Sequence, residues 1–491
     1  MEWTREQRYL PYADWDAQTL LQLQAQAARS QYQLHYHIHP QSGLLNDPNG
    51  FSYFNGEWHV FYQSYPFGPV HGLKSWMHLT SSDLVHWENQ GLALAPDTPY
   101  DSHGAYSGSA MVVDNQLMLM YTGNHRDENW VRTPYQLGAM MAPDGTITKL
   151  PAPLITPPDH VTEHFRDPQL IKRGDTYYAI IGAQDKQTLT GQVAVYSSSD
   201  LHEWHDQGYL QFSKDDMGYM IECPNLVWVD GRPVLIFCPQ GLAQEVQHYA
   251  NIYPNMYLIG DDCDLTTPAI TNATTPTNLD DGFDVYASQA FNAPDGNIYM
   301  ISWVGLPDCT YPTDEEGWAN CLSQVKELHV TPTGELIQQP VTAMKDLRGT
   351  KQALNGAISR EITPLIADAG NHYELHLHFK SSTQGTVFLA GNADCTHAIQ
   401  LRFDTTTGKL TLDRGQAGKA VNPEYGTTRS IALPATAPLD LDIFIDASLG
   451  EIFINGGRHV MTFRFFQEQA ATTVTLTGNG HFDGEYWPLA L

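Results

Sequence analysis

Three acidic residues of the sequence have a proline one or two positions after them, in the short phrases NDPNG at residues 46–50, RDP at 166–168 and ECP at 222–224. A residue before proline is pushed toward extended geometry, so Asp47 and Asp167 are expected on strand-like backbone. Taken singly, the phrases are weak signals, because NDPNG has the composition of a surface turn.

The spacing of these acids is a stronger signal. Asp47, Ser107, Asp167 and Glu222 follow one another at intervals of roughly 60 residues, about the length of one four-stranded propeller blade with its loops. Residues that are separated by one blade length occupy similar positions in successive blades, and such positions surround one axial channel. The spacing therefore predicts that the three carboxyl groups share a pocket.

Carboxyl groups gathered in this way could hydrolyse a glycosidic bond, which needs one ionised acid and one acid that holds a proton. Asp47, beside the amide of Asn46, suits the nucleophile. Glu222, between apolar neighbours, suits the acid/base with a raised pKa. Asp167, next to Arg166, is expected to stay charged and to stabilise the oxocarbenium-like transition state.

Repeated strands elsewhere in the chain favour the same architecture. A turn followed by an aromatic and aliphatic strand recurs at residues 55–62, 114–121, 174–181, 230–237 and 295–301. The phrase SSDLVHW at 81–87 is echoed by SSDLHEW at 198–204. These repeats predict a five-bladed β-propeller over residues 35–342, with a generic all-β protein as the alternative.

The regions outside the repeat have different patterns. Residues 14–33 carry apolar side chains at helical spacing, which predicts one short helix within an N-terminal extension over 1–34. Residues 357–491 alternate as strands without a helix, which predicts a C-terminal β-sandwich after a linker at 343–356. The predicted fold class is all-β.

Composition restricts the partners. The formal net charge of −29 argues against nucleic acid and anionic membranes, and the 25 Tyr and 11 Trp suit a carbohydrate ligand. The N-terminus has no apolar signal segment, no stretch approaches the length of a membrane span, and the six cysteines form no Cys-x-x-Cys pair. We expect a cytoplasmic protein; the oligomeric state stays open.

Five phrases in order resemble the motif set of glycoside hydrolase family 32, the invertases and fructanases: NDPNG, YSGS at 106–109, RDP, ECP and GWA at 317–319. Residues 44–87 and 101–108 most resemble its bacterial sucrose-6-phosphate hydrolase branch. The resemblance implies a retaining β-fructofuranosidase that forms a covalent fructosyl-enzyme, with no metal or organic cofactor. Its implied substrates are sucrose, sucrose 6-phosphate and short fructo-oligosaccharides.

The resemblance also implies roles for individual residues. It matches Asp47 to the nucleophile, Asp167 to the transition-state stabiliser and Glu222 to the acid/base. The substrate contacts that it implies are Asn46, Gln63, Trp76, Tyr106, Ser107, Arg166 and Trp303.

Other readings remain open. An inverting, arabinanase-like propeller glycosidase and a non-catalytic sugar-binding propeller are the competing functions, and the separation of the carboxyl groups distinguishes retention from inversion.

His35, His37 and His39 could bind a metal, but polar packing near the pocket rim is favoured.

Four basic residues in predicted loops raise a question about the substrate. They could form a pocket for a 6-phosphate, or they could be solvated loop charges; they are His71, Lys74, Arg126 and Arg132.

Overall fold

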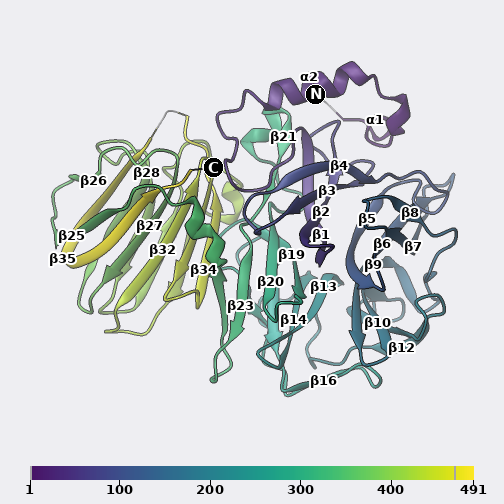
Figure 1. The fold of residues 1–491 in the computed structure, drawn as a ribbon. Coiled ribbons are helices and arrows are strands. Elements are labelled where there is room, and N and C mark those ends of the chain that lie inside the picture. The colour runs from purple at the N-terminus through teal and green to yellow at the C-terminus, as the bar shows by residue number, and fades with distance from the viewer. Residues whose placement is uncertain (1–2, 469–470, 491) are drawn as a thin grey trace.

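The computed structural model describes residues 3–468 and 471–490, and most of them lie in strands. Five small sheets form a ring, and a separate pair of sheets follows at the C-terminal end (Figure 1). The innermost strand of each blade packs against that of the next, and the fifth packs against the first. The predicted class, a five-bladed propeller followed by a β-sandwich, is confirmed.

The five blades follow chain order. The first contains β1 (Gly43–Phe54), β2 (Glu57–Tyr65), β3 (Ser75–Ser81) and β4 (Glu88–Leu94); the second contains β5 (Ala105–Val113), β6 (Gln116–Arg126), β7 (Arg132–Met141) and β8 (Ile147–Lys149). The third contains β9 (Val161–Arg173), β10 (Thr176–Asp185), β11 (Gly191–Ser198) and β12 (His205–Tyr209). The fourth contains β13 (Met220–Val229), β14 (Arg232–Gln240), β15 (Met256–Ile259) and β18 (Thr277–Asn278), and the hairpin of β16 (Asp262–Asp264) and β17 (Ala269–Thr271) lies beside it.

The fifth blade also closes the ring. It contains β19 (Val285–Asn292), β20 (Ile298–Val304), β22 (Cys321–Leu322), β23 (Lys326–Val330) and β24 (Leu336–Pro340). After the 3-10 turn η2 (Pro312–Glu316), strand β21 (Trp318–Ala319) pairs in parallel with β1 of the first blade. A segment from the end of the propeller therefore joins the sheet at its beginning.

The repeated turns of the sequence connect the first and second strands of each blade. Asn55, Asp114 and Asp230 have φ angles of 51°, 53° and 48° at these turns. Positive φ is what tight hairpin turns require, and Asn and Asp tolerate it better than most residues do. The turn chemistry thus explains why the blade repeat can be read from the sequence.

The N-terminal segment lies against the first blade. It contains α1 (Arg5–Arg8), η1 (Tyr12–Asp14) and α2 (Ala17–Ala27). The helix predicted over 14–33 is shorter in the structure: Asp16 caps it by accepting from the Gln18 N–H at 3.1 Å, and the Gln33 side chain donates to the last carbonyl at 2.9 Å. Trp15 stacks on Phe67 of the first blade at 4.6 Å between ring centroids.

The C-terminal part consists of two sheets that share one strand. After η3 (Thr342–Leu347), β35 (Thr473–Pro488) pairs with β26 and β28 through its first half and with β25 and β27 through its second. The other strands and turn are β25 (Gln352–Ile358), β26 (Pro364–Ile366), β27 (His372–Phe379), β28 (Gln384–Gly391), β29 (Ile399–Asp404), β30 (Lys409–Asp413), η4 (Pro423–Tyr425), β31 (Thr428–Ala432), β32 (Leu439–Asp446), β33 (Leu449–Ile454) and β34 (His459–Arg464). Strand β25 thus begins inside the segment predicted as a linker.

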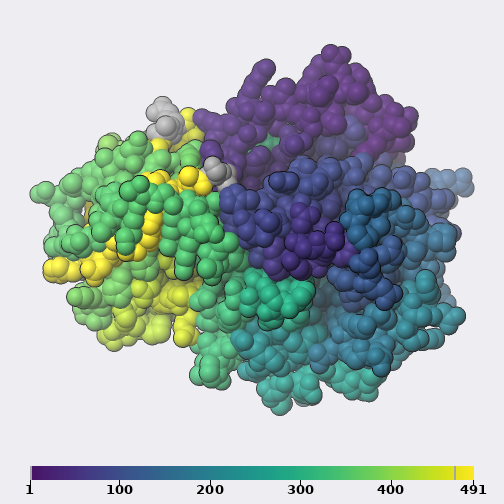
Figure 2. Space-filling model, in the orientation of Figure 1, coloured from purple at the N-terminus to yellow at the C-terminus, as the bar shows by residue number. Residues whose placement is uncertain are grey.

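Buried charges join the propeller to the sandwich, and in Figure 2 the two parts meet along a continuous boundary. His37 contacts Asp446 at 2.9 Å and Glu451 at 3.0 Å, and Lys326 contacts Glu451 at 3.1 Å. The predicted position of these histidines near the pocket rim is therefore wrong for His37, because its partners are carboxylates of the sandwich.

None of the helices in residues 3–468 and 471–490 has the length and apolar character needed to cross a membrane.

Candidate functional site

The innermost strand of every blade is interrupted at the same level of the ring. Its pairing with the second strand shifts register by one residue, which is a β-bulge. At each bulge, two residues of the innermost strand lie opposite a single residue of the second strand. These pairs of residues are 46–47, 106–107, 167–168, 223–224 and 287–288. Because a bulge bends its strand and redirects side chains, five bulges at one level build a site at the axis.

The three predicted acids meet there. Asp47, Asp167 and Glu222 all line one cavity of about 160 Å³. They do not hold equivalent positions within their bulges: Asp47 is the second bulged residue, Asp167 is the first, and Glu222 precedes its bulge. The positions that the blade interval predicts for the acids are therefore equivalent to within a residue or two, and this is close enough for the three carboxyl groups to line one cavity.

Asp167 is held in an unusual backbone conformation. It lies in strand β9, as predicted, but its φ is 66°, so its own backbone is not extended. Asp tolerates this left-handed region better than most residues do. The carboxylate accepts hydrogen bonds from the N–H of Cys223 at 3.0 Å and from its thiol at 3.5 Å. The bulge thus turns the Asp167 side chain toward the fourth blade.

Arg166 pairs with Glu222, although it is adjacent in sequence to Asp167. Its Nε and Nη2 donate to the same oxygen of Glu222 at 3.1 Å and 2.6 Å. The other oxygen of Glu222 accepts from the Tyr286 hydroxyl at 2.6 Å. The apolar surroundings predicted for Glu222 are therefore wrong: its carboxylate lies between two donors.

The pKa values of the two aspartates are raised, whereas the sequence predicted that neighbouring donors would keep both acids ionised. Burial raises the pKa of Asp167 to about 7, and the negative charges of Glu222 and Asp47 add to this effect while Arg166 opposes it. Burial also raises the pKa of Asp47, and the Ser107 hydroxyl opposes this by donating to Oδ2 at 2.5 Å. Asn46 donates to Asp47 as predicted, whereas Arg166 donates to Glu222 and lowers the pKa of Asp167 only through its charge. For both aspartates the cost of burying the charge exceeds the effect of these neighbours.

Most of the predicted substrate contacts surround the acids. Asn46, Gln63, Tyr106, Arg166 and Trp303 line the cavity. Asn46 donates to Asp47 Oδ1 at 3.0 Å, and Gln63 donates to Asp47 Oδ2 at 3.3 Å. The indole nitrogen of Trp303 is buried and has no hydrogen-bond partner within the described residues. Polar groups from four blades thus line one cavity.

Two predicted contacts are placed differently. Ser107 lies behind Asp47, hydrogen-bonded to it and to Gln63. Trp76 is fully buried, does not line the cavity, and donates to the Tyr106 carbonyl at 2.9 Å. A direct contact of Trp76 with a ligand is therefore not supported by the structure, since the ring is covered by Phe61 and Tyr121.

Several residues that line the cavity were not assigned to it from the sequence, and His71, which was considered with Lys74 for a loop pocket, is one of them. Tyr286 lies 64 residues after Glu222, so the blade interval could have indicated it. Tyr9 reaches the cavity from the N-terminal segment, and no signal in the sequence pointed to it. Lys74, which was considered for a loop pocket, is buried and donates to Asn46 Oδ1 at 2.5 Å. Burial lowers the pKa of Lys74 to about 7.

One trio in the site has the spacing of a metal centre. Ligand atoms of Asp47, Asp167 and Cys223 lie within 4.8 Å of one another. Burial and the two negative charges raise the pKa of the Cys223 thiol. Without a metal the thiol is therefore held in its protonated form, and it is the thiolate that binds a metal strongly. The absence of a metal from the reaction stays a prediction.

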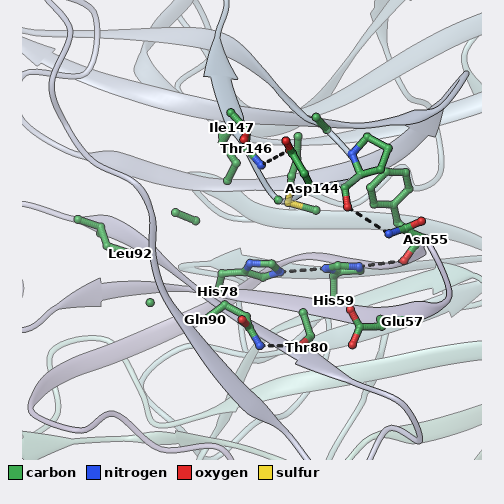
Figure 3. A pocket seen from close by; sticks show the side chains of 17 residues that line it. Asn55, Glu57, His59, His78, Thr80, Gln90, Leu92, Asp144, Thr146 and Ile147 are labelled. Carbon is green, nitrogen blue, oxygen red and sulfur yellow. Dashed lines mark hydrogen bonds between the residues drawn. The ribbon is translucent and has the colours of Figure 1, made fainter.

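A larger cavity of about 550 Å³ lies between the first and second blades (Figure 3). Its two imidazoles contact each other, His59 Nδ1 to His78 Nε2 at 2.9 Å, and the second nitrogen of His59 contacts the Phe54 carbonyl at 3.0 Å. Asp144 accepts from the N–H of Thr146 at 3.0 Å and so stabilises a turn. These polar groups are occupied with one another, so we place the chemistry at the axial cavity.

A five-bladed propeller with three carboxyl groups and several sugar-compatible donors around its axis defines a glycoside hydrolase. Comparisons with known proteins agree. The chain matches the N-terminal domain of glycosyl hydrolases family 32 over residues 37–340 and the C-terminal part of that family over 343–488. The chain belongs to glycosyl hydrolases family 32.

Individual relatives are similar over nearly their whole length. A sucrose-6-phosphate hydrolase from Pediococcus pentosaceus is 49% identical over 480 residues, which are 98% of this chain and 95% of the relative. The solved structure of a sucrose-6-phosphate hydrolase from Lactobacillus gasseri is 57% identical, with a TM-score of 0.96 and 99% of both chains covered. A family GH32 β-fructofuranosidase mutant from Bombyx mori, solved in complex with sucrose, is 29% identical, with a TM-score of 0.84 and coverage of 96% and 97%.

Proposed function

We propose that this protein is a retaining β-fructofuranosidase that hydrolyses sucrose, sucrose 6-phosphate or both, and releases fructose. The observation that carries the proposal is the convergence of Asp47, Asp167 and Glu222 on one axial cavity. The names of the relatives and the sucrose complex of the Bombyx mori protein support this choice of substrate.

The first chemical step joins the sugar to the enzyme. A carboxylate oxygen of Asp47 forms a bond to C2 of the fructosyl unit while the bond from C2 to the glucosyl oxygen breaks. Glu222 gives its proton to that oxygen, and the glucose unit leaves. Charge is conserved, because Asp47 loses its negative charge in the ester and Glu222 becomes a carboxylate.

The second step releases fructose. Water attacks C2, Glu222 takes the proton of that water, and the bond to Asp47 breaks so that its carboxylate returns. Two inversions at C2 give net retention.

The remaining groups would hold the fructosyl unit and the charge that develops on it. Asp167 faces the cavity beside Asp47, so its carboxylate can accept hydrogen bonds from sugar hydroxyls and stabilise positive charge near C2. Asn46, Gln63 and Arg166 offer donors to the same hydroxyls. Trp303 offers an indole face and an unpaired N–H.

We also propose a cytoplasmic location and a small-molecule sugar as the only partner that the site requires. The six cysteines are all unpaired, which suits a reducing compartment.

A direct test is to incubate the purified protein with sucrose and, separately, with sucrose 6-phosphate and to measure free fructose, with Asp47→Asn as the matched inactive form. We expect fructose from the natural protein alone. No release from sucrose or sucrose 6-phosphate would instead favour a sugar-binding propeller.

A further inference from the structure

Five buried polar side chains link the innermost strands of the blades in a closed ring, which we call the belt. Its members are Asn49, Ser109, Gln169, Asn225 and Gln289. Each accepts a hydrogen bond from a backbone N–H of the next blade: Asn49 from Gly108 at 3.0 Å, Ser109 from Leu170 at 2.8 Å, Gln169 from Leu226 at 2.7 Å, Asn225 from Ala290 at 3.3 Å and Gln289 from Phe51 at 2.7 Å. The fifth link returns to the first blade, so the ring is closed.

The belt provides acceptors that the backbone needs. Strands β5, β9, β13 and β19 are edge strands of their sheets, and β1 pairs on this side with β21 through Gly43 and Leu44. Buried N–H groups farther along this edge therefore need acceptors from outside a strand ladder. Because a buried N–H without an acceptor costs free energy, each link fixes one blade against the next.

Two belt residues bind the next blades through both ends of their amide. Gln169 also donates to the carbonyl of Leu226, the residue from which it accepts, at 3.2 Å. Gln289 also donates to the Gly108 carbonyl at 2.9 Å, so it joins the fifth blade to both the first and the second. Removal of either glutamine side chain therefore breaks two links at once.

The belt lies next to the acids. In each strand its member follows the bulge by one or two residues. Asn49 donates back to the Asp47 carbonyl at 3.0 Å, and Asn225 donates back to the Cys223 carbonyl at 3.1 Å. Four of the five belt residues and Asp167 line a small cavity of about 10 Å³, and Asp167 also lines the catalytic cavity. The belt is thus adjacent to the bulges that carry the acids.

The hydrogen bonds that hold the acids cross the boundaries between blades. Arg166 of the third blade and Tyr286 of the fifth both donate to Glu222 of the fourth, each at 2.6 Å. Ser107 of the second blade donates to Asp47 of the first at 2.5 Å. A shift of one blade against its neighbour would therefore move an acid away from its partners. A displacement of about 1 Å in a catalytic site can cost about 10²-fold in rate.

We propose that the belt residues are positioning residues for the reaction, and this inference rests on the proposed function. Gln169 binds the strand that carries Glu222, so it acts on the transfer of the proton to the leaving oxygen. Gln289 binds the strand that carries Asp47, so it acts on the attack at C2.

The test compares three glutamines that are changed in the same way, in the variants Gln169→Met, Gln289→Met and Gln338→Met. Gln338 is the matched control: it is buried on β24, the outermost strand of the fifth blade, and donates to the Leu279 carbonyl at 2.7 Å. For each variant, kcat/KM is measured on the disaccharide that the natural protein cleaves and on a fructoside with an acidic phenol as leaving group.

The two belt variants should differ in a way that a loss of stability alone does not produce. Both should lose about 10-fold or more in kcat/KM on the disaccharide. Gln169→Met should lose less on the phenol fructoside, because that substrate needs no proton from Glu222, so the ratio of the two kcat/KM values should rise several-fold. Gln289→Met should lose equally on both, since both substrates need the attack by Asp47. Gln338→Met should keep the natural values.

The outcomes separate the two proposals. Belt variants that lose no more than Gln338→Met, or that show the same ratio as each other, overturn the inference and leave the proposed function standing. No fructose from either sugar with the natural protein overturns the proposed function itself.

Circular dichroism and thermal unfolding check that each variant is folded at the temperature of the assay. Where Gln169→Met does not fold, Asn225→Leu replaces it, because Asn225 makes the other link of the fourth blade. Asn49→Leu replaces Gln289→Met for the same reason in the first blade. The replacements carry the same expected results.

Discussion

Arg166 donates two hydrogen bonds to one oxygen of Glu222, at 3.1 Å and 2.6 Å, although the residue next to it in the chain is the acid Asp167. Tyr286 donates to the second oxygen of Glu222 at 2.6 Å. The carboxylate of Glu222 is thus held from both sides. A fixed carboxyl group can serve as proton donor and then as base without a search through rotamers.

Replacement of Glu222 should be selective for the leaving group. Glu222→Gln keeps an acceptor for Arg166 but has no proton to give, so hydrolysis of sucrose should fall by about 10²–10⁴-fold. A fructoside with an acidic phenol as leaving group needs no protonation, so its first step should be close to normal. The values of kcat/KM on both substrates check this, because kcat/KM reports the first step, whereas Glu222 also acts as the base of the second step. Equal losses on both would remove Glu222 from the acid role.

Replacement of Asp47 should affect all substrates alike. Asp47→Asn preserves the size of the side chain but removes the attacking charge, so turnover should fall about 10⁴-fold or more, also with a good leaving group. Asp215→Asn, on an exposed loop, is the matched control and should keep full activity. Near-normal hydrolysis by the Asp47 variant, with its fold verified by circular dichroism, would exclude Asp47 as nucleophile.

The blade arrangement could be predicted because its signals are local and repeated. Turns such as Asn55-Gly56 and Asp230-Gly231 take positive φ values that few residues tolerate, so their composition marks the hairpins. Their regular interval then places Asp47, Asp167 and Glu222 near one axis.

The partners of these acids could not be predicted, because they depend on bulges and on contacts between distant segments. The φ of 66° at Asp167 directs its side chain away from Arg166, and nothing in the phrase RDP indicates this angle. The sequence around Lys74 predicts an exposed charge in a loop, but Lys74 is buried because the N-terminal segment covers this stretch. The N–H of the neighbouring Leu73 donates to the Arg8 carbonyl of that segment at 2.7 Å. Tyr9, which lines the cavity, belongs to the same N-terminal segment, so its position could not be predicted either.

The hydroxyl of Ser107 should control the pH dependence of the reaction. It lowers the pKa of Asp47 by donating to it at 2.5 Å, so Ser107→Ala should raise that pKa. Because Asp47 must be ionised to attack, the acid side of the kcat/KM profile should move to higher pH, and kcat/KM at a fixed low pH should fall about 10-fold.

A neighbouring serine gives the control for that experiment. Ser109 lies on the same strand and accepts from the N–H of Leu170 at 2.8 Å, so Ser109→Ala should leave the position of the acid limb unchanged. An unshifted limb in Ser107→Ala would contradict the coupling to Asp47.

Glu451 should stabilise the contact between propeller and sandwich. It is fully buried against His37 and Lys326. Glu451→Gln leaves the buried ammonium group of Lys326 without its anion and leaves His37 with Asp446 alone, so it should cost about 3–5 kcal/mol of unfolding free energy. The exposed pair of Glu335 and Arg458 is the comparison, and Glu335→Gln should cost about 0–1 kcal/mol.

The pH dependence of that cost has a defined sign. Lys326 and His37 lower the pKa of Glu451 from 4.5 to about 2 against the effect of burial, so its stabilisation is complete above pH 4.5 and is lost as the pH falls toward 2. The difference between the natural protein and Glu451→Gln in urea unfolding should therefore narrow below pH 4.5. A difference that widens there would contradict the ion-pair account.

The central claim is that Asp47 carries the fructosyl unit between two inversions at C2, and the stereochemistry of transfer tests it most directly. Sucrose should be incubated with the enzyme in aqueous methanol, and the methyl fructoside formed at early times should be identified by ¹³C NMR. We predict the methyl β-fructofuranoside, with the configuration of sucrose retained. Formation of the α-anomer would contradict the account, because a single displacement inverts C2 and needs no bond to Asp47.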